Sequence, residues 1–245
     1  SETGIIPLSE LEASKQTMTE DEYAQEFLCD FAAALVGAFY GKEMAQAHEK
    51  GRISRVPVDP SVPVGTAWDL GIDDSTAVWF WQLVGREIRI VDYMEVSGLG
   101  LQEIVKEIRD RDYLLGEHLL PHDAAHRELG TGVTRQETLK KLGLKQTKIV
   151  AKLSLEDGIN ATRMLLKKCW LDKEKCERGI SALENYERKW DEKNKIFQSR
   201  PLHNWASHGS DAFRTLAVGL DDSKPTVEEM KSYSRSVSLD YNPFE

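Results

Sequence analysis

The chain has 245 residues, of which 40% are hydrophobic and 30% charged, and its net charge is −9. This composition is typical of a globular protein, and the acidic balance argues against a surface that binds nucleic acid broadly. No apolar run approaches the roughly 20 residues that span a bilayer, and no signal-peptide pattern opens the sequence. Three widely spaced cysteines argue against a disulfide framework or a zinc motif and favour reduced thiols in a cytosolic setting.

The charge is distributed unevenly along the chain. Residues 126–175 contain twelve Lys or Arg against six Asp or Glu, a net charge of +6, so the remainder carries −15. A basic middle could contact a phosphate backbone locally, although solvated helix faces explain the same residues equally well.

The first 60 residues are predicted to form a helical extension. Helices are expected from Leu8, after a cap at Thr19, and over 43–50. Three prolines within 57–63 then predict a stiff, extended linker. We therefore expect a domain boundary there, between residues 1–60 and a main domain over 61–220.

The main domain begins with a predicted antiparallel meander. A strand that contains Asp69 is followed by an acidic turn and by strands over 77–84 and 87–96. Further strands and helices are then expected to alternate, and residues 221–245 lack periodicity and predict a flexible tail. The predicted elements after the meander are a helix over 101–112, a strand over 117–125, a helix from Thr134 to Gly143, a strand over 147–151, helices over 154–168 and 173–186, a hairpin over 188–198 and a last helix over 207–220.

This order of elements predicts an α/β domain. A meander followed by alternating strands and helices fits a ribonuclease H-like mixed five-stranded sheet flanked by helices better than a doubly wound Rossmann domain. The sequence contains neither a G-x-G-x-x-G pattern after a strand nor a G-x-x-x-x-G-K-[ST] loop. A phosphate-binding loop for ATP is therefore not expected in this chain.

Three aspartates stand out by their position. Asp69 lies within the first strand, Asp123 at the end of the fourth, and Asp211 at the start of the last helix. Aspartate is depleted in strands and costly to bury without a partner, and Mg²⁺ or Mn²⁺ prefers such oxygen ligands. If the two strands are neighbours, the three carboxylates could hold two cations about 3.5–4 Å apart for phosphodiester hydrolysis.

Other readings of these polar residues remain open. Any single aspartate could be a turn former or a helix cap, which fits Asp73 and Asp74, although Asp74 could support the site from outside. His122 lies four residues before His126, a spacing that leaves a zinc site open. His208 could orient a ligand near Asp211 or be an exposed loop histidine.

Four segments resemble the C-terminal nuclease domain of the large terminase subunit of tailed double-stranded DNA bacteriophages. They are Trp68-Asp69-Leu70-Gly71-Ile72-Asp73-Asp74-Ser75-Thr76-Ala77, Leu120-Pro121-His122-Asp123-Ala124-Ala125, His208-Gly209-Ser210-Asp211-Ala212-Phe213-Arg214 and Met18-Thr19-Glu20-Asp21-Glu22-Tyr23-Ala24-Gln25-Glu26-Phe27. The last resembles the segment that leads from the packaging ATPase into the linker. The resemblance covers roughly residues 5–220.

The resemblance implies a ribonuclease H-like endonuclease that cuts viral DNA concatemers during genome packaging. It implies an acidic triad of Asp69, Asp123 and Asp211 with two divalent cations, Mg or Mn. The partners it implies are double-stranded DNA, the terminase small subunit, the portal protein and the ATPase domain of the same polypeptide, in the host cytoplasm and without a membrane. Because this chain lacks the Walker motifs, it is not expected to translocate DNA alone.

Basic side chains in the middle of the chain are the expected contacts to the DNA backbone. These are Arg127, Arg135, Lys140, Lys141, Lys148 and Lys152. Three alternatives remain. They are a resolvase or transposase of the same fold, a nucleotide-binding domain of the actin and sugar-kinase type, and a non-catalytic module that docks to other packaging proteins.

Overall fold

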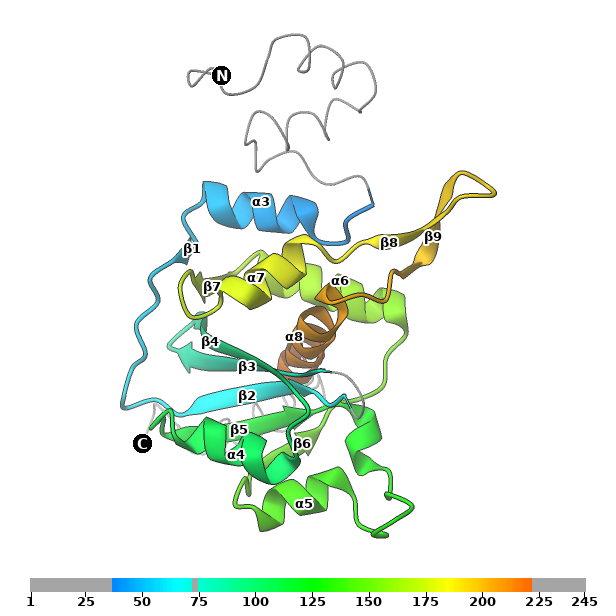
Figure 1. Cartoon of the computed structure of the whole chain (residues 1–245). Helices are drawn as coiled ribbons and strands as arrows, with labels where there is room; N and C mark the ends of the chain where they lie inside the picture. The colour runs from blue at the N-terminus through cyan, green and yellow to red at the C-terminus, as the bar shows by residue number, and fades with distance from the viewer. Residues whose placement is uncertain (1–36, 72–74, 222–245) are drawn as a thin grey trace, which may run out of the picture.

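The computed structural model describes residues 37–71 and 75–221 (Figure 1). The helices expected within residues 1–36, the turn that contains Asp73 and Asp74, and the tail expected from residue 222 onward lie outside the described residues. None of the described helices is both long and apolar enough to cross a membrane.

The described elements alternate between strands and helices. The strands are β1 (Ile53–Ser54), β2 (Val64–Asp69), β3 (Ser75–Val84), β4 (Glu87–Ser97), β5 (Leu115–Leu120), β6 (Thr147–Ile149), β7 (Cys169–Asp172), β8 (Arg188–Asp191) and β9 (Ile196–Pro201). The helices are α3 (Gly41–Glu49), α4 (Leu101–Arg109), η1 (His122–Ala125, a 3₁₀ turn), α5 (Arg135–Lys141), α6 (Leu155–Leu166), α7 (Glu177–Glu184) and α8 (Ala206–Asp221).

Seven strands form one mixed sheet in the order β1-β7-β4-β3-β2-β5-β6, and β8 and β9 form a separate hairpin. The predicted meander is confirmed, since β3 pairs antiparallel with both β2 and β4. The other neighbouring strands run parallel, including β2 with β5. The prediction of five strands was too low, because β1 and β7 contain only two and four residues and show no alternating pattern.

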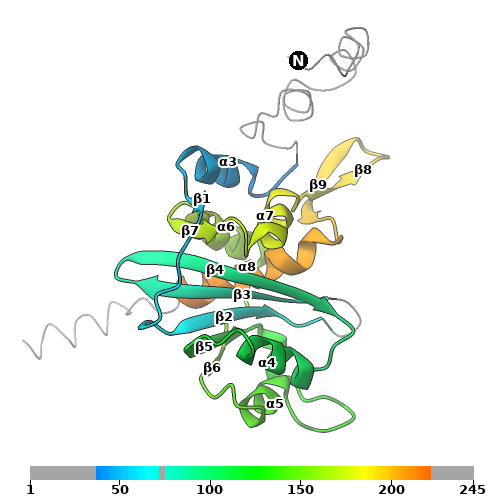
Figure 2. The same ribbon diagram turned by 60° about the vertical axis from the view of Figure 1, so that its left-hand side comes forward.

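Helices cover both faces of the sheet (Figure 2). On one face α3, α6, α7 and α8 enclose a core that includes Trp79 and Phe213. On the other face α4 and α5 cover a second core that includes Trp68 and Phe80. Successive side chains of a strand point to opposite faces, which is why neighbours such as Trp79 and Phe80 lie in different cores.

Helix α8 lies directly on the sheet, against β2 and β3. Gly209 permits this close approach, because a Cβ atom there would lie 2.8 Å from the hydroxyl of Tyr93 and 2.9 Å from Cβ of Ala182. The carbonyl of Gly209 also accepts a hydrogen bond of 2.8 Å from the indole of Trp79. The start of α8, which carries Asp211, is therefore fixed against the sheet.

Two predicted boundaries differ from the structure in the region that follows the meander. The helix expected to reach Asp112 ends at Arg109, and Asp112 adopts a positive φ of 54°. The strand expected over 117–125 ends at Leu120, because Pro121 has no N–H to continue the ladder. Asp123 therefore lies in the short turn η1 beyond the strand rather than at its end.

The described part of the predicted N-terminal extension packs on the main domain. Phe39, Tyr40 and Met44 are buried in the core that α6, α7 and α8 share. Strand β1 pairs in parallel with β7 at the edge of the sheet.

Candidate functional site

Asp69 is the last residue of β2, so it lies at the carboxyl end of this inner strand, on the face of the sheet that α8 covers. Ala67, two residues earlier, lies in the core beneath α8, and the period of two puts Asp69 on the same side. Its Oδ2 atom lies 3.2 Å from Nδ1 of His208, so the histidine predicted as a supporting residue contacts the first acid directly.

The neighbouring strand brings Asp123 to the same end of the sheet. Since β2 and β5 are parallel, their carboxyl ends lie side by side, and η1 follows β5 after a single proline. Oδ2 of Asp123 lies 3.9 Å from the guanidinium of Arg135. Its Oδ1 is buried and has no hydrogen-bond partner within the described part of the chain. Because 45% of the Asp123 side chain is exposed, the carboxylate keeps contact with solvent, and its Oδ1 is available to a cation or a donor.

Helix α8 contributes Asp211, which two side chains hold. Arg214 lies one turn later on α8 and forms an ion pair of 2.9 Å with Oδ1, and the hydroxyl of Tyr186 donates to the same oxygen at 3.3 Å. Burial raises the pKa of Asp211. Arg214 opposes this shift, and the nearby negative charge of Asp69 adds to it.

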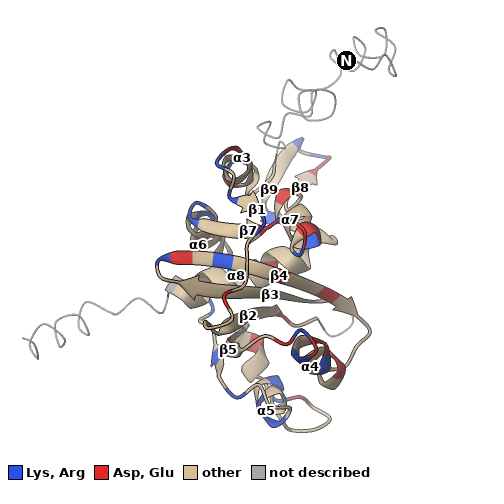
Figure 3. Ribbon diagram, turned by 90° about the vertical axis from the view of Figure 1, so that its left-hand side faces the viewer, with Lys and Arg blue, Asp and Glu red and all other residues tan. Residues whose placement is uncertain are grey.

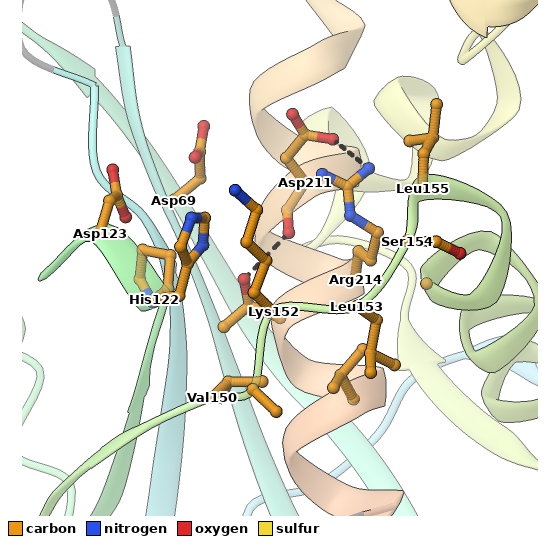
Figure 4. Close-up of a pocket in the computed structure, with 15 residues that line it drawn as sticks. Asp69, His122, Asp123, Val150, Lys152, Leu153, Ser154, Leu155, Asp211 and Arg214 are labelled. Carbon is orange, nitrogen blue, oxygen red and sulfur yellow. Dashed lines mark hydrogen bonds and ion pairs between the residues drawn. The ribbon is translucent and has the colours of Figure 1, made fainter. Parts of the chain in front are cut away.

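All three predicted acids line a single cavity of about 310 Å³ between the sheet edge, α8 and the segment that follows β6 (Figure 4). Asp69 and Asp123 approach from the sheet side, and Asp211 lies across from them on α8, with its carboxylate turned toward Arg214. Lys152 lines the same cavity and extends from an exposed loop. The structure thus brings together carboxylates that are far apart in the sequence and places a cationic side chain beside them.

The other predicted DNA-binding residues have different environments. Lys140 and Lys141 are exposed in the last turn of α5, and Arg127 is exposed and donates to the carbonyl of Gly132. Lys148 donates to the carbonyl of Gly219 at 3.0 Å, and Arg135 is largely buried.

The donors around the cavity suit a hard divalent cation in kind. Carboxylate oxygens are the ligands that Mg²⁺ and Mn²⁺ prefer, and the unpartnered Oδ1 of Asp123 supplies one. Within residues 37–71 and 75–221, however, no three His, Cys, Asp or Glu side chains already form a ligand cluster. Asp211 is engaged by Arg214, so a cation would have to compete with this ion pair.

Three residues of the site have no predicted role: Arg214, Tyr186 and Gly158. All three belong to the surroundings of Asp211, because Arg214 pairs with it, Tyr186 donates to it, and Gly158 leaves room for the Arg214 side chain. The i, i+3 spacing of Asp211 and Arg214 on one helix is the signal that could have found the pair. The contacts of Tyr186 and Gly158 are tertiary and leave no local pattern.

Comparison with known proteins identifies the fold. No family model and no curated protein sequence matches the chain. The large terminase of a thermophilic bacteriophage is similar in structure, with a TM-score of 0.55 and 17% identity over 87% of this chain and 52% of that chain. The nuclease domain of the P22 large terminase is similar with a TM-score of 0.54 and 15% identity, over 70% of this chain and 89% of that chain.

The chain therefore spans about half of the first protein and most of the second, which is a nuclease domain alone. The mixed sheet flanked by helices agrees with the predicted ribonuclease H-like architecture. This chain has the fold of the nuclease domains of bacteriophage large terminases.

Proposed function

We propose that this chain is a terminase nuclease domain that hydrolyses phosphodiester bonds of double-stranded DNA with the help of divalent cations. The observation that carries the proposal is the convergence of Asp69, Asp123 and Asp211 on one cavity, at the edge where β2 and β5 end. The terminase nuclease fold supports the same reading.

The three aspartates would hold two cations, Mg or Mn. When bound, such cations supply an activated water and stabilise the negative charge on the leaving oxygen of an in-line displacement. The cations also let an acidic cavity accept a DNA backbone of the same charge sign.

The protein's own side chains would orient these groups. His208 contacts Oδ2 of Asp69, which fixes one carboxylate in the cavity. Tyr186 and Arg214 hold the carboxylate of Asp211 until a cation competes for it. Lys152 lies where it can contact a phosphate of the scissile strand without reading its sequence.

We further propose that the natural substrate is concatemeric viral DNA, in the context of a packaging motor in the host cytoplasm. The terminase of the thermophilic phage has also been solved in complex with ADP, and this chain covers 52% of it. A nucleotide-hydrolysing part of the same polypeptide, the small subunit and the portal protein are the partners that this context implies.

Nicking of supercoiled plasmid in Mn²⁺ or Mg²⁺ tests the function. We expect Asp69→Asn, Asp123→Asn and Asp211→Asn each to reduce the nicking rate at least about 100-fold, because loss of a mere outer-shell partner already costs about 10–100-fold. Asp110→Asn is the control, since Asp110 is exposed directly after α4 and lines no part of the cavity. Undiminished cleavage by all three cavity variants would contradict the proposal.

A further inference from the structure

Arg135 differs from the other basic residues of the region in how it is held. It is the first residue of α5, and only 13% of its side chain is exposed. The helix start is fixed by a capping box, in which Thr134 accepts from the N–H of Glu137 and the Glu137 side chain accepts from the N–H of Thr134. An arginine in this setting has little freedom to follow a DNA backbone.

The guanidinium of Arg135 joins segments that converge on the candidate site. It donates to the carbonyl of Leu70 at 3.1 Å, directly after Asp69 at the end of β2. It lies 3.9 Å from Oδ2 of Asp123 in η1 and 3.4 Å from Oε1 of Glu128 in the following loop. One side chain thus contacts the backbone beside the first acid and the carboxylate of the second.

The two oxygens of Asp123 have opposite surroundings. Oδ2 faces Arg135, whereas the buried Oδ1 has no hydrogen-bond partner in the described chain. At 3.9 Å the pair is an ion pair beyond hydrogen-bond distance, so the guanidinium attracts Oδ2 and favours the rotation that leaves Oδ1 available as a ligand. Such outer-shell contacts orient the ligands of metal sites.

We propose that Arg135 is a positioning residue that orients Asp123, and the end of β2 that carries Asp69, for binding of the divalent cations. The proposal rests on the proposed function and assigns Arg135 a different role from the backbone contact expected from the sequence. The planar fork of arginine suits contacts to a carbonyl and two carboxylates from a largely buried position better than the single ammonium group of lysine does.

The test compares Arg135→Gln and Arg135→Lys with Arg127→Gln, a control that removes the same charge from an exposed position in the loop before α5. Calorimetry with Mn²⁺ measures cation binding, and titration of duplex DNA in EDTA at several salt concentrations measures backbone contacts. We expect Arg135→Gln to weaken Mn²⁺ binding about 10–100-fold and to leave the salt slope of DNA binding unchanged. Arg135→Lys should recover part of the loss, and Arg127→Gln should leave Mn²⁺ binding unchanged.

Four results would be informative. If Arg135→Gln binds Mn²⁺ normally and its slope of log K for DNA against log salt is shallower by about 0.9, Arg135 contacts the DNA backbone and the inference is overturned. If the wild type and Arg135→Gln bind Mn²⁺ equally well and Asp69→Asn does not bind it, the inference is overturned and the proposed function stands. Failure of the wild-type protein to bind Mn²⁺ would overturn the proposed function and the inference together. If a thermal melt shows that Arg135→Gln is unfolded, Arg135→Lys decides: unchanged Mn²⁺ affinity would overturn the inference and weakened affinity would support it.

Discussion

At the scale of single residues, each acid of the cavity has its own positively polarised neighbour. Asp69 faces a histidine, whereas Asp123 and Asp211 each face an arginine. Clustered carboxylates repel one another, and these neighbours offset the repulsion in the absence of a cation. A cation that enters the cavity would compete with the ion pair between Asp211 and Arg214, whereas Oδ1 of Asp123 has no hydrogen-bond partner in the described chain to give up. The arrangement explains how three acids can converge in a folded chain without metal.

The buried side chain of His118 on β5 shows the cost of burying an ionisable group in the core. It lies on β5 with 2% of its surface exposed, and its Nδ1 is 2.7 Å from the hydroxyl of Thr66, which also accepts from the indole of Trp68. Burial lowers the pKa of His118 to about 4, from an ordinary value of 6.5. The unfolded chain therefore binds a proton more readily than the folded chain between pH 6.5 and pH 4.

This difference predicts that His118 makes the fold less stable as the pH falls through that range. From pH 7 to pH 5, the free energy of unfolding should drop by about 2 kcal/mol because of this group. Urea unfolding of wild type and His118→Gln at both pH values measures it: the variant should lose about 2 kcal/mol less than the wild type between them. An equal loss in both proteins would show that His118 is not the group responsible.

At the scale of elements, parallel pairing decides where the acids meet. The carboxyl ends of β2 and β5 lie at the same sheet edge, and α8 crosses that face with its first turns fixed by Gly209. Helix α7 is fixed on the same face in a similar way. A Cβ atom on Gly179 would press on the ring of Trp79 and lie 2.8 Å from Cγ of Tyr93.

Gly179→Ala is therefore expected to destabilise the protein, although alanine favours a helix by about 1 kcal/mol over glycine. Overpacking against two buried rings costs about 1–3 kcal/mol, and the backbone of α7 would have to shift. The midpoint of urea unfolding measures the change. Ser181→Ala on the same helix is the control and should alter stability by less than about 0.5 kcal/mol. A Gly179→Ala protein as stable as the wild type would mean that α7 packs loosely.

Local signals explain which elements the sequence could predict. The meander follows from alternating strands and a tight turn at Gly85, which has a φ of 62°. The starts of α5 and α6 follow from the caps at Thr134 and Ser154. The three acids of the cavity could be proposed because Asp69 interrupts an apolar strand, Asp123 follows a strand and Asp211 lies near the start of a helix. The structure places all three around one cavity.

Tertiary contacts explain what the sequence could not predict. Strand β7 was missed because four residues show no period, and its position depends on distant groups such as the backbone N–H of Val56, which donates to Asp172. The internal contacts of Arg135 were missed for the same reason, since the carbonyl of Leu70 is 65 positions away in the sequence. In the sequence, a basic residue in the first turn of a helix looks the same whether its side chain faces DNA or the protein.

At the scale of the whole molecule, the acidic chain carries a basic end. Within the described residues, helix α5 and its exposed lysines lie at the opposite end from α3, as Figures 1 and 3 show. A second cavity, of about 540 Å³, shares Asp123 with the first and is also lined by Arg127 and Arg135. We therefore expect DNA to approach from the α5 side of the site, where local positive charge offsets the net charge of −9.

This orientation predicts that lysines at the two ends contribute unequally to DNA binding. The double variant Lys140→Gln, Lys141→Gln on α5 should weaken binding of duplex DNA. It should also make the negative slope of log K against log salt shallower by up to about 1.8, because each lost phosphate contact removes about 0.9 from its magnitude. The matched double variant Lys42→Gln, Lys50→Gln removes the same charge from exposed positions at α3 and should leave the slope unchanged. Titrations in EDTA at several salt concentrations separate the two, since metal-dependent cleavage is then absent. If the slope becomes shallower for the α3 variant and stays unchanged for the α5 variant, the DNA binds on the α3 side.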